Sequence, residues 1–141
     1  MATDGTINSR IYHKECRKLG ITPVKPSPER QRDVMSLIYD DIKSGKKGDR
    51  AKFDRVLSEF MRKGCDAVIL ACTELSVFKG KHEIPTLCLD AMDVLVRESI
   101  IRSGAPVPVE KRTLREINHG KNAVSYNRGI SGAAEKKRAA L

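Results

Sequence analysis

Residues 64–76 read Gly64-Cys65-Asp66-Ala67-Val68-Ile69-Leu70-Ala71-Cys72-Thr73-Glu74-Leu75-Ser76 and decide the fold. The run from Ala67 to Ala71 is continuously apolar, which is typical of a strand buried on both faces of a parallel sheet. In an open α/β sheet, ligands bind beyond the carboxyl ends of the strands. We therefore predict that the thiol of Cys72, followed directly by a hydroxyl and a carboxylate, lies where a ligand binds.

Helix-like and strand-like segments alternate on both sides of this run. Apolar residues at helical spacing predict helices at about 9–19, 28–43, 50–63 and 91–102. Short apolar runs predict further strands at 21–25 and 86–89. The alternation predicts an α/β fold, a parallel sheet flanked by helices.

Four local expectations concern the segments next to these elements. Residues 1–7 read as the end of a strand followed by a turn at 3–6, and the residues after Glu74 read as a loop. Asp90 is suited to cap the helix that follows it. The apolar residues of that helix are expected to pack on the sheet: Met92, Leu95, Val96, Ile100 and Ile101.

Length and cysteine usage limit the class of protein. A chain of 141 residues has room for one domain that buries about two thirds of its unfolded surface. Its four cysteines have no paired metal-ligand spacing, and with no secretory leader they indicate reduced thiols and a cytoplasmic protein. No apolar run reaches the ~18 residues that a membrane span requires.

The positive charge is concentrated at the end of the chain. Of the net +9, residues 106–141 contribute +5, from eight Lys and Arg against three Asp and Glu. This segment is rich in Gly, Ala, Lys and Arg and holds few large apolar residues that could offset the entropy of ordering it. We therefore predict a folded domain at 1–105 and a loose basic tail at 106–141.

The stretch Ala71-Cys72-Thr73-Glu74 resembles the Gly-Cys-Thr-Glu motif that ends a strand in the aspartate/glutamate racemases. Other stretches match the same family in order and spacing: Ala2-Thr3-Asp4-Gly5-Thr6, Ile11-Tyr12, Pro26-Ser27, residues 38–45 and residues 89–93. The resemblance covers residues 1–103. Members of the family have two similar halves, and this sequence matches the second. The resemblance therefore implies one half of a two-domain racemase-like fold, with the half that carries a Cys-Asn-Thr motif absent.

The family resemblance also implies a reaction. Racemising an amino acid without a cofactor requires two acid/base groups, one on each side of the α-carbon. Cys72 matches one of them, and the other thiol of the family belongs to the first half. Because a strand-end thiol lies near unpaired backbone N–H groups, we expect its thiolate to be favoured. Cys65 lies at the opposite end of the strand, and Cys16 and Cys88 read as buried structural thiols.

Further site residues follow from the same resemblance. Lys43 matches a lysine that binds a substrate carboxylate, whereas on sequence alone it reads as a solvated lysine. Thr73 and Glu74 would orient ligand groups, or serve as a helix cap and a first-turn acid. Thr3 and Thr6 match positions at the end of the first strand, where hydroxyls can hold a carboxylate.

Three functions are compatible with these features. The first is a cofactor-independent racemase of aspartate, glutamate or a related amino acid, which we expect to be inactive without a complementary half or another subunit of a homo-oligomer. The second is a non-catalytic binding or interaction module derived from such a half. The third is a basic nucleic-acid binder, which ranks last because the basic segment has one aromatic residue, Tyr126, and no recognised motif. No membrane partner and no metal site are expected.

Overall fold

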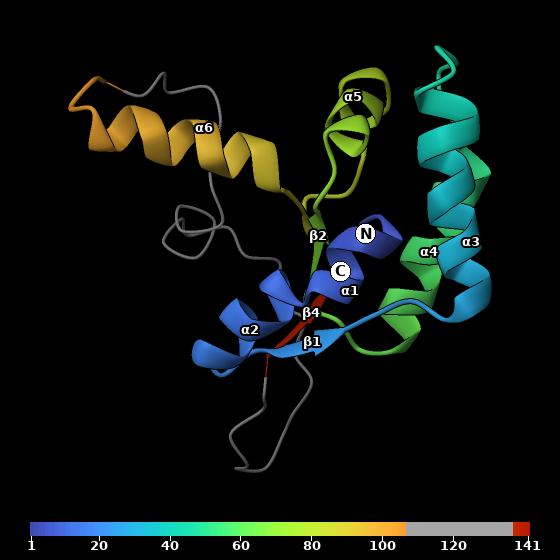
Figure 1. Ribbon diagram of the computed structural model, residues 1–141, viewed down its shortest axis with the longest axis horizontal. Helices are drawn as coiled ribbons and strands as arrows, with labels where there is room; N and C mark the ends of the chain where they lie inside the picture. The colour runs from blue at the N-terminus through green and yellow to red at the C-terminus, as the bar shows by residue number, and fades with distance from the viewer. Residues whose placement is uncertain (107–136) are drawn as a thin grey trace. The chain divides into compact units, whose positions relative to one another are not determined.

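The computed structural model describes residues 1–106 and 137–141 (Figure 1). The chain divides into two compact units, one made of residues 1–96 and 136–141 and the other of residues 97–135. The first unit contains the sheet and the candidate site. It is therefore the unit described below.

The sheet has four parallel strands. They are β1 (Thr22–Val24), β2 (Ala67–Leu70), β3 (Cys88–Asp90) and β4 (Arg138–Ala140), in the order β1-β4-β2-β3. Helices flank the sheet, so the predicted α/β class and the central apolar strand are confirmed. Pro23 lies in β1 at the edge of the sheet, where the missing N–H of proline is tolerated.

Strand β4 was not predicted. It lies between β1 and β2, with Ala140 paired to Val24 on one side and to Val68 on the other (Figure 1). Ala139, Ala140 and Leu141 are buried. The expectation of a loose tail is therefore wrong for the last residues of the segment 106–141, while residues 107–136 lie outside the described part of the chain.

The first residue continues the line of β4 along β2. The Met1 amine donates to the carbonyl of Ile69, and the Met1 carbonyl accepts from the N–H of Ala71 at 2.9 Å. Helix α1 (Asp4–Ser9) follows directly, with Thr3 as its N-cap, so the turn predicted at 3–6 is helical instead. Arg10, in the left-handed region at φ 57°, separates α1 from α2 (Ile11–Lys18).

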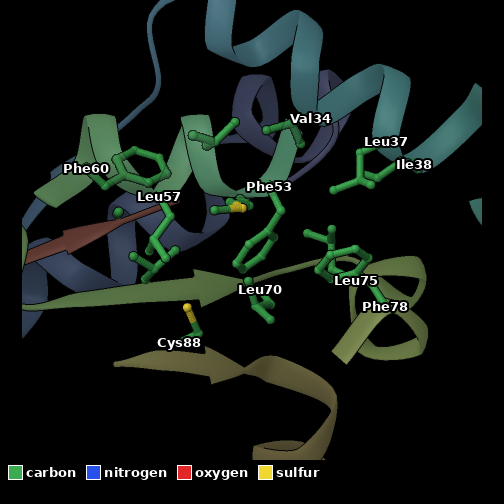
Figure 2. Packing of buried hydrophobic residues seen from close by; sticks show 14 of the residues in the cluster. Val34, Leu37, Ile38, Phe53, Leu57, Phe60, Leu70, Leu75, Phe78 and Cys88 are labelled. Carbon is green, nitrogen blue, oxygen red and sulfur yellow. The ribbon is translucent and has the colours of Figure 1, made fainter. Parts of the chain in front are cut away.

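The main core lies between β2 and three consecutive helical segments. These are α3 (Pro28–Ser36), the π-helix η1 (Leu37–Ile42) and α4 (Arg50–Arg62). Figure 2 shows Phe53, Leu57 and Phe60 of α4 lying over β2. Ser27 caps α3, and its N–H and hydroxyl both donate to the carboxylate of Glu59 in α4, at 2.7 and 2.6 Å.

Two helices differ from the sequence-based expectation. Residues 73–81 form helix α5 (Thr73–Lys81), not a loop, and it buries Leu75 and Phe78. Helix α6 (Ala91–Arg102) has the predicted bounds, and Asp90 caps it by accepting from the N–H of Met92 at 2.9 Å. However, residues 91–96 of α6, which belong to the first unit, include no buried side chain, so the expectation that Met92, Leu95 and Val96 are buried against the sheet is wrong.

Candidate active site

Cys72 lies at the carboxyl end of β2, at the N-cap position of α5. Its backbone is extended, and its carbonyl accepts from the N–H groups of Leu75 and Ser76, at 3.0 and 3.4 Å. Its side chain is partly exposed, whereas the other three cysteines are buried. Cys72 is thus the accessible thiol of the four.

Glu74 links Cys72 to the other polar groups at this edge of the sheet. Cys72 Sγ donates to Glu74 Oε2 at 2.8 Å, and the hydroxyl of Thr73 donates to the same oxygen at 3.1 Å. Lys43 Nζ lies 3.7 Å from Glu74 Oε1. Four of the six predicted site residues therefore meet: Lys43, Cys72, Thr73 and Glu74.

Lys43 reaches this cluster from the end of η1. Its N–H donates to the carbonyl of Ile38 at 2.9 Å, which is the wide turn of a π-helix, a feature often found at functional sites. Its ammonium also lies 4.3 Å from the centre of the Tyr39 ring, a cation–π contact. The lysine is about half exposed, with 46% of its side-chain surface open.

The protonation state of Cys72 differs from the expectation. Burial, together with the hydrogen bond to the Glu74 carboxylate, raises the pKa of Cys72 to about 11. The hydrogen bond from Cys72 in turn lowers the pKa of Glu74. At neutral pH the pair is therefore a thiol and a carboxylate, and the expectation of a favoured thiolate is wrong in this structure.

Thr3 and Thr6 are not joined to this cluster. Their hydroxyl oxygens lie 3.1 Å from each other, and Thr3 Oγ1 accepts from the N–H of Thr6 at 3.4 Å. Both contacts lie between the N-cap and the first turn of α1. Thr3 is nevertheless only two residues from Met1, whose carbonyl pairs with Ala71 beside Cys72.

A pocket of about 200 Å³ opens beside Cys72. It is lined by Tyr12, Leu70, Ala71, Cys72, Thr73, Ser76, Ala91, Met92 and Leu95. Sequence reasoning did not assign Ser76, Met92 or Leu95 to the site. Ser76 could have been found had residues 73–81 been read as a helix, because it then lies one turn after Cys72.

Ser76 is held by a buried carboxylate. Its hydroxyl donates to Asp90 Oδ1 at 2.8 Å, and Asp90 is only 4% exposed at the end of β3. The carboxyl ends of β2 and β3 therefore both supply groups at this edge of the sheet. The pocket lies where ligands bind in open α/β sheets.

The other three cysteines lie away from this cluster. Cys65 precedes β2 at the far end of the strand, and Cys16 and Cys88 are buried, as expected for structural thiols. In residues 1–106 and 137–141, no group of three His, Cys, Asp or Glu side chains is arranged to hold a metal ion. Over the same residues, every helix is too short or too polar to cross a membrane.

Comparison with known protein families identifies the family of this chain. The family model of the Asp/Glu/hydantoin racemases matches residues 1–99, which include β1 to β3 and the whole Cys72 cluster. The chain therefore belongs to the Asp/Glu/hydantoin racemase family. Enzymes of this class are isomerases.

Proposed function

We propose that this chain contributes one acid/base group, the thiol of Cys72, to the racemisation of an amino acid. The observation that carries the proposal is the hydrogen bond of 2.8 Å between Cys72 and Glu74 at the mouth of the pocket. It orients the proton of the one accessible thiol. Membership of a racemase family supports an acid/base role for that thiol.

Proton transfer follows from the protonation state of the cluster. A base on the far side of the substrate removes the α-proton, and the electron pair left on carbon delocalises into the substrate carboxylate. Cys72, held as a thiol, then gives its proton to the opposite face of the α-carbon and becomes a thiolate. In the reverse direction, the thiolate removes the proton. Side-chain groups perform every step, so the proposed mechanism uses no cofactor.

Lys43 supports this step. The ammonium of Lys43 would attract the substrate carboxylate and stabilise the negative charge that grows on it. It also lowers the pKa of Glu74, which keeps the acceptor of the thiol proton charged. Thr3 and Thr6 would join the site only if a bound carboxylate drew their hydroxyls away from each other.

The second acid/base group would come from a partner. Among the described residues, Cys72 is the only cysteine that lines the pocket. We propose that a complementary racemase half, or a second copy of this chain, covers the pocket and supplies the opposing group. The exposed apolar side chains of Met92 and Leu95 at its rim are suited to such a contact.

Exchange of the α-proton with deuterated water tests the proposal. We expect only a trace of exchange with amino acids for this chain alone, and a large increase when a separately expressed first half of a related racemase is added. Cys72→Ser should abolish the increase, whereas Cys16→Ser should keep it. Strong exchange by the chain alone would instead assign the second group to another copy. Exchange that survives Cys72→Ser would refute the role of this thiol.

A second candidate function is ligand binding without turnover. It is favoured by the pKa of Cys72. With a pKa of about 11, almost none of the side chain is in the thiolate form, which is the form that accepts a proton, at neutral pH. In that case the pocket would bind an amino acid, and no complementing half would restore exchange. The same assay therefore separates the two functions.

A further inference from the structure

The pocket beside Cys72 has an uncharged lining. Of the nine described residues that form it, five have aliphatic or thioether side chains: Leu70, Ala71, Ala91, Met92 and Leu95. The others are Tyr12 and three small polar residues, and none carries a full charge. At about 200 Å³, the pocket is below the about 300–1,000 Å³ of sites that hold drug-sized ligands, so its occupant is small.

The charges around the pocket lie behind its wall or to one side. Asp90 stands behind Ser76, and the cation nearest to it, Lys79, pairs with Asp93 at 2.5 Å and lies 3.9 Å from Asp90. Lys43 does not line the pocket, and its ammonium faces Glu74. The described residues therefore offer one cation for one substrate carboxylate.

The described residues that line this pocket offer no partner to a second carboxylate. An acidic side chain placed among Leu70, Met92 and Leu95 would lose part of its hydration without gaining a cation from the lining, and the fixed carboxylate of Asp90 would repel it. An aliphatic side chain of the same shape would instead gain from leaving water. The lining thus discriminates by charge.

We propose that this pocket takes the uncharged, apolar side chain of a monocarboxylic amino acid, not the acidic side chain of aspartate or glutamate. That the ligand is an amino acid rests on the proposed function. That its side chain is apolar rests on the lining of the pocket. The family resemblance alone favours an acidic substrate, so the two sources of inference lead to different ligands.

Leucine and aspartate form a matched pair for the test, because the branched end of leucine has nearly the shape of the aspartate carboxylate. Both enantiomers of each are titrated into the full chain at pH 7, and binding is followed by calorimetry and by NMR. We expect leucine to bind at least 10-fold more tightly than aspartate. Tighter binding of aspartate, or no binding of either amino acid, would overturn the proposal.

A cation placed in the pocket should reverse the preference. Met92→Lys adds a charge at nearly constant length, and Met92→Gln is the uncharged control. Met92 is 39% exposed, and its backbone cap to Asp90 is kept in both variants. We expect Met92→Lys to shift the ratio of aspartate to leucine affinity by at least 10-fold, and Met92→Gln to leave leucine preferred. An unchanged ratio in Met92→Lys would contradict the assignment of this pocket.

Proton exchange is measured separately and distinguishes the two proposals. Leucine binding without exchange, even with a complementing half, would support the apolar pocket and refute the racemase role. Exchange of aspartate in preference to leucine would support the racemase role and refute the apolar pocket.

Discussion

Helices α4 and α6 are nearly equal in length, at 13 and 12 residues, yet they differ in what they bury. Helix α4 buries Phe53, Val56, Leu57 and Phe60, while α6 buries no side chain. At 100° per residue, these four residues of α4 fall within an arc of about 100°. The apolar residues at 92, 94, 95 and 96 spread over about 200°. The narrow apolar stripe of α4 can be covered by a single sheet. The wide apolar surface of α6 cannot be covered from one side, so part of it stays exposed.

The comparison also separates stability from function. The α4 side provides closely packed core, with the Phe53 and Phe78 rings stacked at 5.0 Å. The first half of α6 instead contributes Met92 and Leu95 to the pocket beside Cys72. Substitutions on the two helices should therefore affect different properties.

The largest expected effect is loss of stability at α4. Phe53 is fully buried, so Phe53→Ala should lower the free energy of unfolding by about 3–5 kcal/mol, through lost burial and the cavity left behind. Leu95→Ala is the control on α6, where the side chain is 60% exposed, and it should cost less than about 1 kcal/mol. Urea unfolding measures both. Equal losses would show that α6 is packed as tightly as α4.

A second substitution tests the centre of the sheet. Ala140 is fully buried between β1 and β2, so Ala140→Asp would bury a carboxylate without a partner and cost about 2–4 kcal/mol. The matched control is Ala105→Asp at an exposed position. A harmless Ala140→Asp would mean that β4 does not hold the centre of the sheet.

The core thiol Cys88 should make stability fall at alkaline pH. Burial raises its pKa from 9.0 to about 11, so the unfolded chain releases this proton first as the pH rises. The contribution of the protonated Cys88 thiol to the free energy of unfolding is complete below pH 9. It is lost between about pH 9 and 11, at up to about 1.4 kcal/mol per pH unit. Urea unfolding across this range, compared with Cys88→Ala, isolates it. Parallel pH curves for the two proteins would contradict the raised pKa.

The smallest expected effect is on the site thiol. Glu74→Gln removes the carboxylate that helps to raise the pKa of Cys72, so alkylation by iodoacetamide at pH 7.5 should become about 2–10-fold faster. Cys88 in the same protein should react slowly in both forms because it is buried. Peptide mapping after brief labelling gives both rates.

Two controls sharpen this last measurement. Glu83→Gln removes an exposed carboxylate and should leave the labelling of Cys72 unchanged. Lys43→Met should slow it, because Lys43 lowers the pKa of Cys72. If Glu74→Gln labelled more slowly than the unmodified chain, the carboxylate would be activating the thiol.

The sequence was sufficient for the parts of the fold that depend on local pattern. The apolar run before Cys72 predicted β2, and the spacing of Phe53, Val56, Leu57 and Phe60 predicted α4. That Lys43 and Glu74 belong to one site was predicted from the family resemblance, because no local pattern relates residues so far apart in the sequence.

Other features depend on tertiary contacts that the pattern does not encode. Strand β4 consists of Arg138, Ala139 and Ala140, which have little strand propensity, and it forms because β1 and β2 both pair with it. The thiolate form of Cys72 was predicted from its place at a strand end, near unpaired backbone N–H groups. Burial and the carboxylate of Glu74 act in the opposite direction and outweigh it.

The position of β4 has a consequence for folding during synthesis. The ribosome completes β1, β2 and β3 long before it reaches Arg138, the residue that pairs with Thr22. Until then β1 lacks the only neighbour that the described residues give it in the sheet, and the edge of β2 at Ala67 and Val68 stays unpaired. Closing the sheet across such a sequence separation is intrinsically slow. The nascent chain therefore exposes unpaired strand edges to other extended segments until its last residues are made.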